Sequence, residues 1–264
     1  IPEKYLKDLC FNPTKKIVNF CKKKSIPVIC FPKGLKDNYK KFLDLGNPYN
    51  CVSILSDFDF DEILIINKIR KLDEKYLSFL EKLASMSKLP LAFTGNLTEV
   101  EYCYRLIESG FERIFFNSLH FNNLDKIIKV SKRLGKQSVG LKLDIVIKNA
   151  KHLIKSKADY YDLDKFLINQ IDMCSKIYSE INFNFVQWDG KNNETQTIFK
   201  IIEKYLNTNV NLSITGGVVT HKMLDYFAKK EVDACYCFIA PSTDINKKVK
   251  LPNDSLVRHR RKVN

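Results

Sequence analysis

Two aspartates stand where apolar segments of the sequence end, and a carboxylate in that place can do proton-transfer chemistry. Asp144 ends the segment 138–144, and Asp189 follows the segment 181–188. Each can act as an acid, a base or a hydrogen-bond anchor for a ligand. Structural roles are the alternatives, because Asp144 can cap a loop and Asp189 with the following glycine can form an ordinary turn. We predict both aspartates as catalytic residues.

Glycines and small polar residues at other segment ends are suited to binding phosphate. A glycine pair that closes a strand and opens a helix lets backbone N–H groups and the helix N-terminus hold an anion. Asparagine and serine add further donors for the second end of an elongated phosphorylated ligand. Ordinary turns remain the alternative for each position. The predicted substrate and phosphate contacts are Gly95, Asn96, Asn117, Ser118, Gly216 and Gly217.

The histidines and cysteines are not spaced like metal ligands. The sequence has no CxxC pair and no HxH or HxxxH spacing, so we predict no metal site and no cofactor. His120, His152 and His221 are expected on the surface or in loops. The eight cysteines are expected to be reduced and mostly buried, which is typical of a cytoplasmic protein. Residues 1–24 alternate charged and apolar residues instead of forming a signal-peptide core, which also favours the cytoplasm.

The candidate residues require elements that bring several segment ends together. Apolar segments rich in β-branched and aromatic residues recur along the chain, each followed by a segment of helical periodicity. This alternation predicts an α/β fold with a parallel sheet, and eight repeats can close it into a single-domain (β/α)8 barrel, the TIM barrel. An open doubly wound sheet is the alternative. The predicted strands are residues 26–31, 62–66, 89–94, 113–117, 138–144, 181–188, 210–215 and 233–239.

Two segments of different character flank the predicted barrel, which spans residues 25–241. Residues 1–24 are predicted as an N-terminal helical extension, with Pro13 near the start of its helix. The chain after residue 241 has no comparable apolar stripe. The N-terminal helix is therefore expected to cover the seam between the last and first strands. Residues 242–264 are predicted as a basic C-terminal tail.

The net charge of +14 is consistent with nucleic acid, an acidic partner or phosphorylated ligands. Most of the excess is spread over the polar faces of predicted helices, and the dense basic run is residues 258–262. No interleaving of aromatic and basic residues accompanies it, which disfavours nucleic acid. No segment reaches the roughly 18 uncharged apolar residues of a membrane-spanning helix, so we predict no membrane partner.

A series of short motifs follows the predicted strands and helices in a distinctive order. The motifs are Gly46-Asn47-Pro48, Asp61-Glu62-Ile63-Leu64, Leu89-Pro90-Leu91, Thr94-Gly95-Asn96, Gly110-Phe111-Glu112-Arg113-Ile114, Asn117-Ser118, Gly135-Lys136-Gln137-Ser138, Asp144, Asp189-Gly190, Gly216-Gly217 and Val232-Asp233-Ala234. From about residue 42 onward, the series resembles the cyclase subunit of imidazole glycerol phosphate synthase and its relatives in surface-polysaccharide biosynthesis.

This resemblance implies a lyase or amidotransferase-type synthase subunit of the kind found in histidine biosynthesis. Such a barrel takes ammonia from a partner glutaminase of the class I amidotransferase type and adds it to a phosphorylated or nucleotide-linked sugar derivative. The family closes the bottom of the bore with a ring of charges. Glu62, Arg113 and Glu180 match this ammonia gate by position, and Lys24 would complete it. Ordinary charges at strand starts are the alternative.

The sequence also departs from the family. In the family, the first strand ends in an aspartate. Residues 29–34 of this chain read ICFPKG instead, so the acid or base expected at that place is missing. Residues 1–41 instead resemble a segment of uroporphyrinogen decarboxylase. The arginine-rich substrate motif of that enzyme is not in the sequence, so decarboxylation is not predicted. Divergence, gene fusion and engineering all remain open as explanations of the mixture.

We therefore predict a cyclase-type barrel in which Asp144 transfers protons and Asp189 is a second polar anchor. A barrel that has lost its chemistry and serves as a binding or scaffold subunit is the alternative. The missing first-strand aspartate favours the scaffold, whereas Asp144 and the charge ring favour the synthase.

Overall fold

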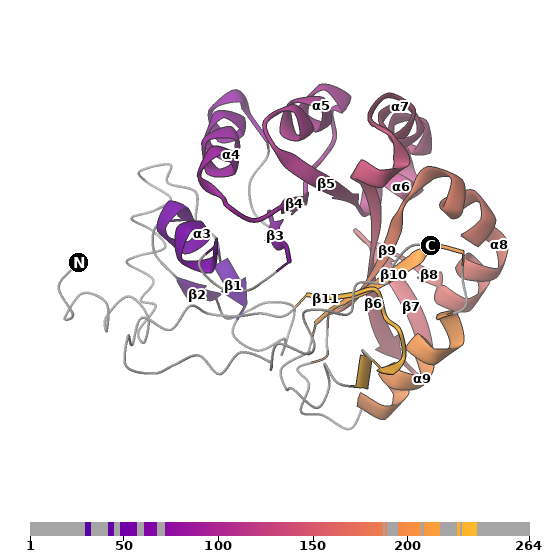
Figure 1. Cartoon of the computed structure of the whole chain (residues 1–264). Coiled ribbons are helices and arrows are strands. Elements are labelled where there is room, and N and C mark those ends of the chain that lie inside the picture. The colour runs from indigo at the N-terminus through magenta and orange to yellow at the C-terminus, as the bar shows by residue number, and fades with distance from the viewer. Residues whose placement is uncertain are drawn as a thin grey trace, which may run out of the picture.

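The structure is a computed structural model of the 264-residue chain (Figure 1). It describes residues 30–32, 42–44, 48–56, 61–67, 72–186, 188, 195–206, 209–216, 226–227 and 229–236. The predicted N-terminal helix over the seam and the basic tail 242–264 lie outside these residues, and both stay predictions.

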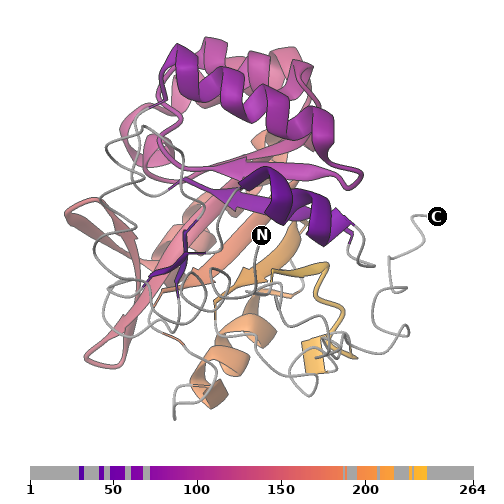
Figure 2. The ribbon, with the colours of Figure 1, turned by 90° about the vertical axis from the view of Figure 1, so that its left-hand side faces the viewer.

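A curved parallel sheet forms the centre of the molecule (Figures 1 and 2). Its strands follow the order β11-β10-β9-β6-β5-β4-β3, and each pairs in parallel with its neighbour. Their bounds are β3 Ile63–Ile66, β4 Leu91–Thr94, β5 Phe111–Phe116, β6 Val139–Lys148, β9 Glu180–Phe185, β10 Asn211–Thr215 and β11 Ala234–Tyr236.

The two outer strands of this sheet meet across the interior. The Tyr236 hydroxyl of β11 donates a hydrogen bond of 2.7 Å to the Glu62 carboxylate, which directly precedes β3. The Tyr236 ring also contacts Phe115 of β5 edge to face, with centroids 6.2 Å apart. An open sheet would keep its first and last strands far apart. The curvature and the alternation with helices therefore confirm the TIM-barrel prediction over the doubly wound alternative.

Helices cover the outer side of the sheet (Figures 1 and 2). In α4, Asp73 caps the N-terminus by accepting a hydrogen bond of 2.7 Å from the Tyr76 N–H, while Leu77, Leu80 and Leu83 are fully buried along one face. The helical segments are α3 Pro48–Ser56, α4 Glu74–Met86, α5 Val100–Glu108, α6 Ser118–Asn122, α7 Leu124–Leu134, η1 Lys136–Ser138, α8 Leu163–Ile177 and α9 Thr195–Tyr205. No described helix is long and apolar enough to cross a membrane.

The segment predicted as the first barrel strand behaves differently. Its described part, β1 (Cys30–Pro32), pairs antiparallel with β2 (Phe42–Asp44) in a sheet of two strands. Residues 33–41 between them are too few for the crossover that a parallel pair requires, so these neighbours can pair only antiparallel. Within the described chain, the parallel sheet thus begins at β3 rather than at residues 26–31.

A hairpin that the sequence did not predict extends the sheet beyond Asp144. Strand β6 continues to Lys148 and pairs antiparallel with β7 (Lys151–Ser156), which pairs with β8 (Asp159–Asp162). The tight turn is made by Asn149 and Ala150, both with positive φ. A stacked contact of 4.4 Å between the Tyr161 and Phe121 rings packs β8 against α6. The hairpin therefore stands at the end of the sheet where Asp144 lies.

Candidate active site

Polar side chains line the inner face of three neighbouring strands. Side chains alternate along a strand, so residues two apart share a face, and residues in register on parallel neighbours lie side by side. Lys142 is in register with Asn182, and Asp144 with Asn184. The inward polar residues are Lys142 and Asp144 of β6, Glu180, Asn182 and Asn184 of β9, and Ser213 and Thr215 of β10.

Three donors hold the Asp144 carboxylate near the carboxyl ends of the strands. Its Oδ1 accepts hydrogen bonds from Lys142 Nζ at 2.8 Å and from Asn184 Nδ2 at 2.5 Å. Its Oδ2 accepts one from Asn117 Nδ2 at 2.9 Å. An ammonium and two amides that all donate favour the ionised carboxylate. The Asp144 carboxylate is therefore held in one orientation by three donors.

The Asp144 side chain is 22% exposed, so one of its edges reaches solvent. The Lys142 side chain, in contrast, is 3% exposed. A carboxylate tied to a basic neighbour is what a structural role requires. An exposed edge at the carboxyl ends of the strands is what proton transfer to a ligand requires. The geometry thus permits Asp144 to accept a proton from a molecule bound above it.

The predicted gate residues come together at the opposite, amino-terminal end of the strands. The Arg113 guanidinium of β5 donates to the Glu180 carboxylate of β9 and lies 3.9 Å from Glu62 Oε2. Glu180 also accepts a hydrogen bond from the Ser213 hydroxyl. We call Glu62, Arg113 and Glu180 the charge ring. Lys24, the fourth predicted member, lies outside the described residues.

Burial dominates the electrostatics of the charge ring. It raises the pKa of Glu180 to about 7, although the Arg113 guanidinium and the Ser213 hydroxyl act in the opposite direction. Burial alone would lower the pKa of Arg113, but the Glu180 and Glu62 carboxylates outweigh it and raise that pKa. Removal from water also raises the pKa of Tyr236 well above its ordinary value.

Replacing Glu180 should change how the stability of the protein depends on pH. The pKa of Glu180 rises from an ordinary 4.5 to about 7 on folding, so between these values the folded state binds more protons than the unfolded state. The stability of the wild type should therefore fall as pH rises through this window, by about 1 to 3 kcal/mol relative to Glu180→Gln. Urea unfolding of both proteins over this pH range measures it. Parallel stability curves would contradict the prediction.

The described members of the predicted phosphate contacts are backbone positions with positive φ and residues at the start of α6. Gly95 (φ +111°) and Gly216 (φ +124°) are required by close packing, since an added Cβ would lie 2.0 Å from the Asn67 carbonyl oxygen and 2.8 Å from that of Phe185, respectively. Asn96 follows Gly95 with a positive φ of 54°. Asn117 and Ser118 stand at the start of α6, and the Asn117 amide donates to Asp144.

The loops that hold these residues follow β4, β5 and β10 at the same end of the sheet as Asp144. The structure thus groups Gly95, Asn96, Asn117, Ser118 and Gly216 at that end. Asp189 and Gly217 lie outside the described residues. Phosphate binding at these positions stays a prediction.

The sequence of the chain matches a known protein family. The family described as histidine biosynthesis protein matches residues 32–235, from β1 to β11. The chain belongs to this family. It is 28% identical over 218 residues to a putative imidazole glycerol phosphate synthase subunit hisF3 of Vibrio vulnificus, covering 76% of this chain and 80% of the relative.

Two further relatives of this histidine biosynthesis family member carry similar names. The imidazole glycerol phosphate synthase subunit HisF of Sulfurisphaera tokodaii is 21% identical over 194 residues, or 72% of this chain and 76% of that protein. The HisF subunit of Phocaeicola vulgatus is 22% identical over 219 residues, or 80% and 87%. The family match begins at residue 32, so the resemblance of residues 1–41 to uroporphyrinogen decarboxylase stays a prediction.

Several polar residues of the barrel interior were not predicted from the sequence. Lys142, Asn184 and Asn182 stand on strands read as continuous apolar runs, yet all three are directed inward. A signal was present, because polar residues occur at every second position in 142–144, 180–184 and 213–215. This period of two indicates a strand with one polar face, which in a barrel is the inner one.

His120 is not on the surface, where it was predicted. It is 5% exposed, shares a hydrogen bond of 2.7 Å with the Tyr178 hydroxyl, and burial lowers its pKa. Its aromatic character suits the cluster with Phe121 and Phe166, which the hairpin completes. Cys51, Cys103 and Cys174 are free and buried, and Cys235 is free and half-buried, which agrees with the prediction of reduced, mostly buried thiols. No group of three metal-ligating side chains occurs among the described residues.

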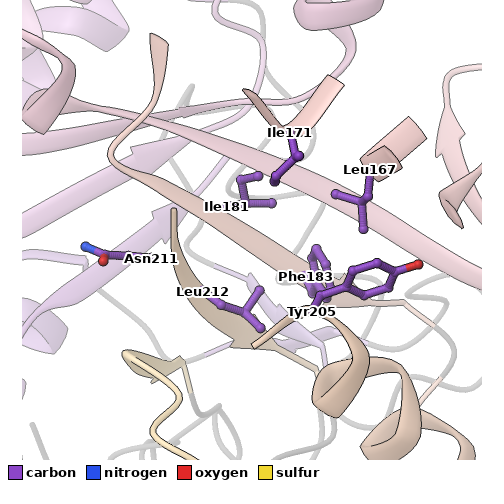
Figure 3. Close-up of a pocket in the computed structure, with 7 residues that line it drawn as sticks. All are labelled: Leu167, Ile171, Ile181, Phe183, Tyr205, Asn211 and Leu212. Atoms are coloured by element: carbon purple, nitrogen blue, oxygen red, sulfur yellow. The ribbon is translucent and has the colours of Figure 1, made fainter. Parts of the chain in front are cut away.

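A small apolar recess lies on the outer side of the sheet (Figure 3). Because Ile181 and Phe183 alternate with Glu180, Asn182 and Asn184 along β9, they face away from the bore. The polar groups of the lining are the Asn211 amide and the Tyr205 hydroxyl. The Tyr205 hydroxyl donates a hydrogen bond to Asp164. The recess holds no charged side chain and is separate from Asp144. Its lining is Leu167, Ile171, Ile181, Phe183, Tyr205, Asn211 and Leu212.

Proposed function

We propose that the chain is a cyclase-type synthase subunit that receives ammonia from a partner glutaminase of the class I amidotransferase type. Its acceptor is a phosphorylated or nucleotide-linked sugar derivative, as in an imidazole glycerol phosphate synthase or a related enzyme of surface-polysaccharide biosynthesis. The names of the relatives support this class of reaction. The reaction would take place in the cytoplasm, where glutamine-dependent biosynthesis occurs.

The observation that carries the proposal is the Asp144 carboxylate, fixed by Lys142, Asn184 and Asn117 with one edge exposed. When ammonia adds to a carbonyl carbon of the acceptor, the C–N bond forms as the C=O π electrons move onto the oxygen, which takes up a proton from water. The nitrogen is left positive and must lose a proton. Asp144 Oδ2 or Oδ1 accepts that proton in our proposal, and the exposed edge returns it to water. Asp189 serves as a second anchor for the acceptor.

Ammonia would enter at the charge ring and leave beside Asp144. Polar side chains line this route through the barrel. Asn182 Nδ2 donates to Ser213 Oγ at 2.9 Å, and Thr215 Oγ1 donates to Asn182 Oδ1 at 2.9 Å. These side chains offer hydrogen-bonding atoms between the two ends of the barrel. We therefore assign the glutaminase to the amino-terminal end of the strands and the acceptor to the carboxyl end.

The acceptor end can be probed with inorganic phosphate. We expect phosphate soaked into crystals to bind near Gly216 and Gly217, where backbone N–H groups would face the anion, and near Gly95. Its position in the electron density is the measurement. Phosphate bound solely to surface lysines would contradict the assignment of the six predicted contacts.

A second candidate function is that of a scaffold subunit without chemistry. The observation that favours it is the ion pair of 2.8 Å between Lys142 and Asp144, because a structural carboxylate is expected to have such a neighbour. The two candidates differ in one measurable property. A scaffold retains binding of a glutaminase but shows no turnover with added ammonium chloride, whereas the synthase turns over.

A further inference from the structure

Lys142 is a cation in the interior of the barrel, and the proposed reaction uses it only as one of three donors that hold Asp144. The residue is 2% exposed, its neighbour in register on β9 is the equally buried Asn182, and Asp144 lies two residues further along β6. Its ammonium donates to Asp144 Oδ1 at 2.8 Å. Among the described carboxylates, Asp144 is the one paired with it.

A buried ammonium is costly, so its retention here calls for a reason. Moving such an ion out of water costs several kcal/mol even after relaxation, and an apolar side chain of similar volume often stabilises a protein more. The interior next to Lys142 does hold such side chains, since Phe115 lies over Gly140 and would meet an added Cβ at 2.4 Å. Packing by itself would therefore favour an apolar residue at position 142.

The charges around Asp144 show what Lys142 does to it. The other described charges of the interior, Arg113, Glu180 and Glu62, contact one another in the charge ring at the far end of the strands. The inner faces of β4, β5, β9 and β10 bring uncharged residues beyond the charge ring, which are Ala92, Thr94, Phe115, Asn182, Asn184, Ser213 and Thr215. The hydroxyl of Tyr236 on β11 donates to Glu62 of the charge ring. Among the described residues, Lys142 is a charged group in direct contact with Asp144, at 2.8 Å.

We propose that Lys142 is a positioning residue that keeps Asp144 ionised and directed between Asn117 and Asn184, so that Asp144 accepts a proton and does not donate one. The use of that proton in catalysis rests on the proposed function. Its physical core, the control of Asp144 by Lys142, holds with or without turnover. Lys142 has no direct contact with the substrate in this scheme, because its side chain is 3% exposed.

The test follows the Asp144 carboxyl carbon by NMR as pH is lowered, in protein labelled at aspartate, without substrate. In Lys142→Met, the pH at which Asp144 takes up its proton should rise by about one to three pH units, because an opposite charge in contact has been removed. Lys204→Met is the matched control, since it removes an exposed lysine 2.9 Å from another carboxylate, Asp164. It should leave Asp144 unchanged.

A measurement on the wild type covers the case in which Lys142→Met does not fold. The nitrogen of the Lys142 ammonium should change its NMR shift at the pH at which Asp144 protonates, because the two atoms share a hydrogen bond. No step in that shift, or an unmoved Asp144 titration in folded Lys142→Met, would overturn the proposal.

The proposed function fails by a different result, namely absence of ammonium-dependent turnover in the wild type. In an active protein, Lys142→Met should shift the acidic limb of the kcat/KM profile to higher pH. A lysine that merely fills space would lower stability and leave the limb in place.

Discussion

Asp144→Asn is expected to lower ammonium-dependent turnover by about a hundredfold or more, the usual scale for losing general acid–base help. An amide in this place can donate to a ligand but cannot take up the proton that the new C–N bond releases. The side chain has nearly the same shape, so binding of the acceptor should change far less than kcat. Steady-state kinetics with ammonium chloride as the nitrogen donor separates the two constants.

The same substitution leaves the Lys142 ammonium, 3% exposed, without its carboxylate. A buried ion that loses its partner destabilises a fold, so Asp144→Asn should also lower the midpoint of thermal unfolding. The double variant Asp144→Asn with Lys142→Met removes both charges and should recover stability without recovering turnover. Recovery of turnover in the double variant, or full turnover in the single one, would refute the role of Asp144.

Asp164→Asn is the matched control for this experiment. Asp164 also pairs with a lysine, Lys204 at 2.9 Å, but its side chain is 44% exposed on the outer side of the barrel. Its replacement should leave turnover as it is, which shows that the effect at Asp144 is specific to the interior.

Arg113→Met is expected to destabilise the protein by about 3 kcal/mol, because it leaves the buried Glu180 carboxylate without its cation. Glu62 would lose the same partner. The loss should be largest above neutral pH. At lower pH Glu180 takes up a proton, so less buried charge is left uncompensated. Urea unfolding at both ends of this pH range measures the difference.

Arg105→Met is a suitable control for Arg113→Met, since Arg105 also contacts two carboxylates, Glu74 at 2.6 Å and Glu81 at 2.7 Å. These pairs lie on the surface, where water and salt weaken them, so their loss should be much less harmful. Equal losses for the two variants would mean that burial of the charge ring has no energetic weight.

The sequence by itself determined the alternation of apolar strands and amphipathic helices, and with it the barrel. It also indicated Glu62, Arg113 and Glu180 at strand starts, and it placed Asp144 at a strand end, although β6 continues to Lys148. These are local properties, since the hydrophobic period and the position within a repeat are readable from a few neighbouring residues. The charge ring itself was predicted from the resemblance to the cyclase family, and parallel strands bring these like ends together.

Only the tertiary structure decided which side chains hold Asp144. Asn117 is 27 residues before it and Asn184 is 40 residues after it, so both contacts depend on strand register, which a slip of one residue would reverse. The antiparallel pairing of β1 with β2 likewise depends on the length of chain between them. The contact of Tyr236 with Glu62 joins residues 174 apart and exists because the sheet curves. Such contacts follow from the closed sheet as a whole, whereas sequence patterns describe one strand at a time.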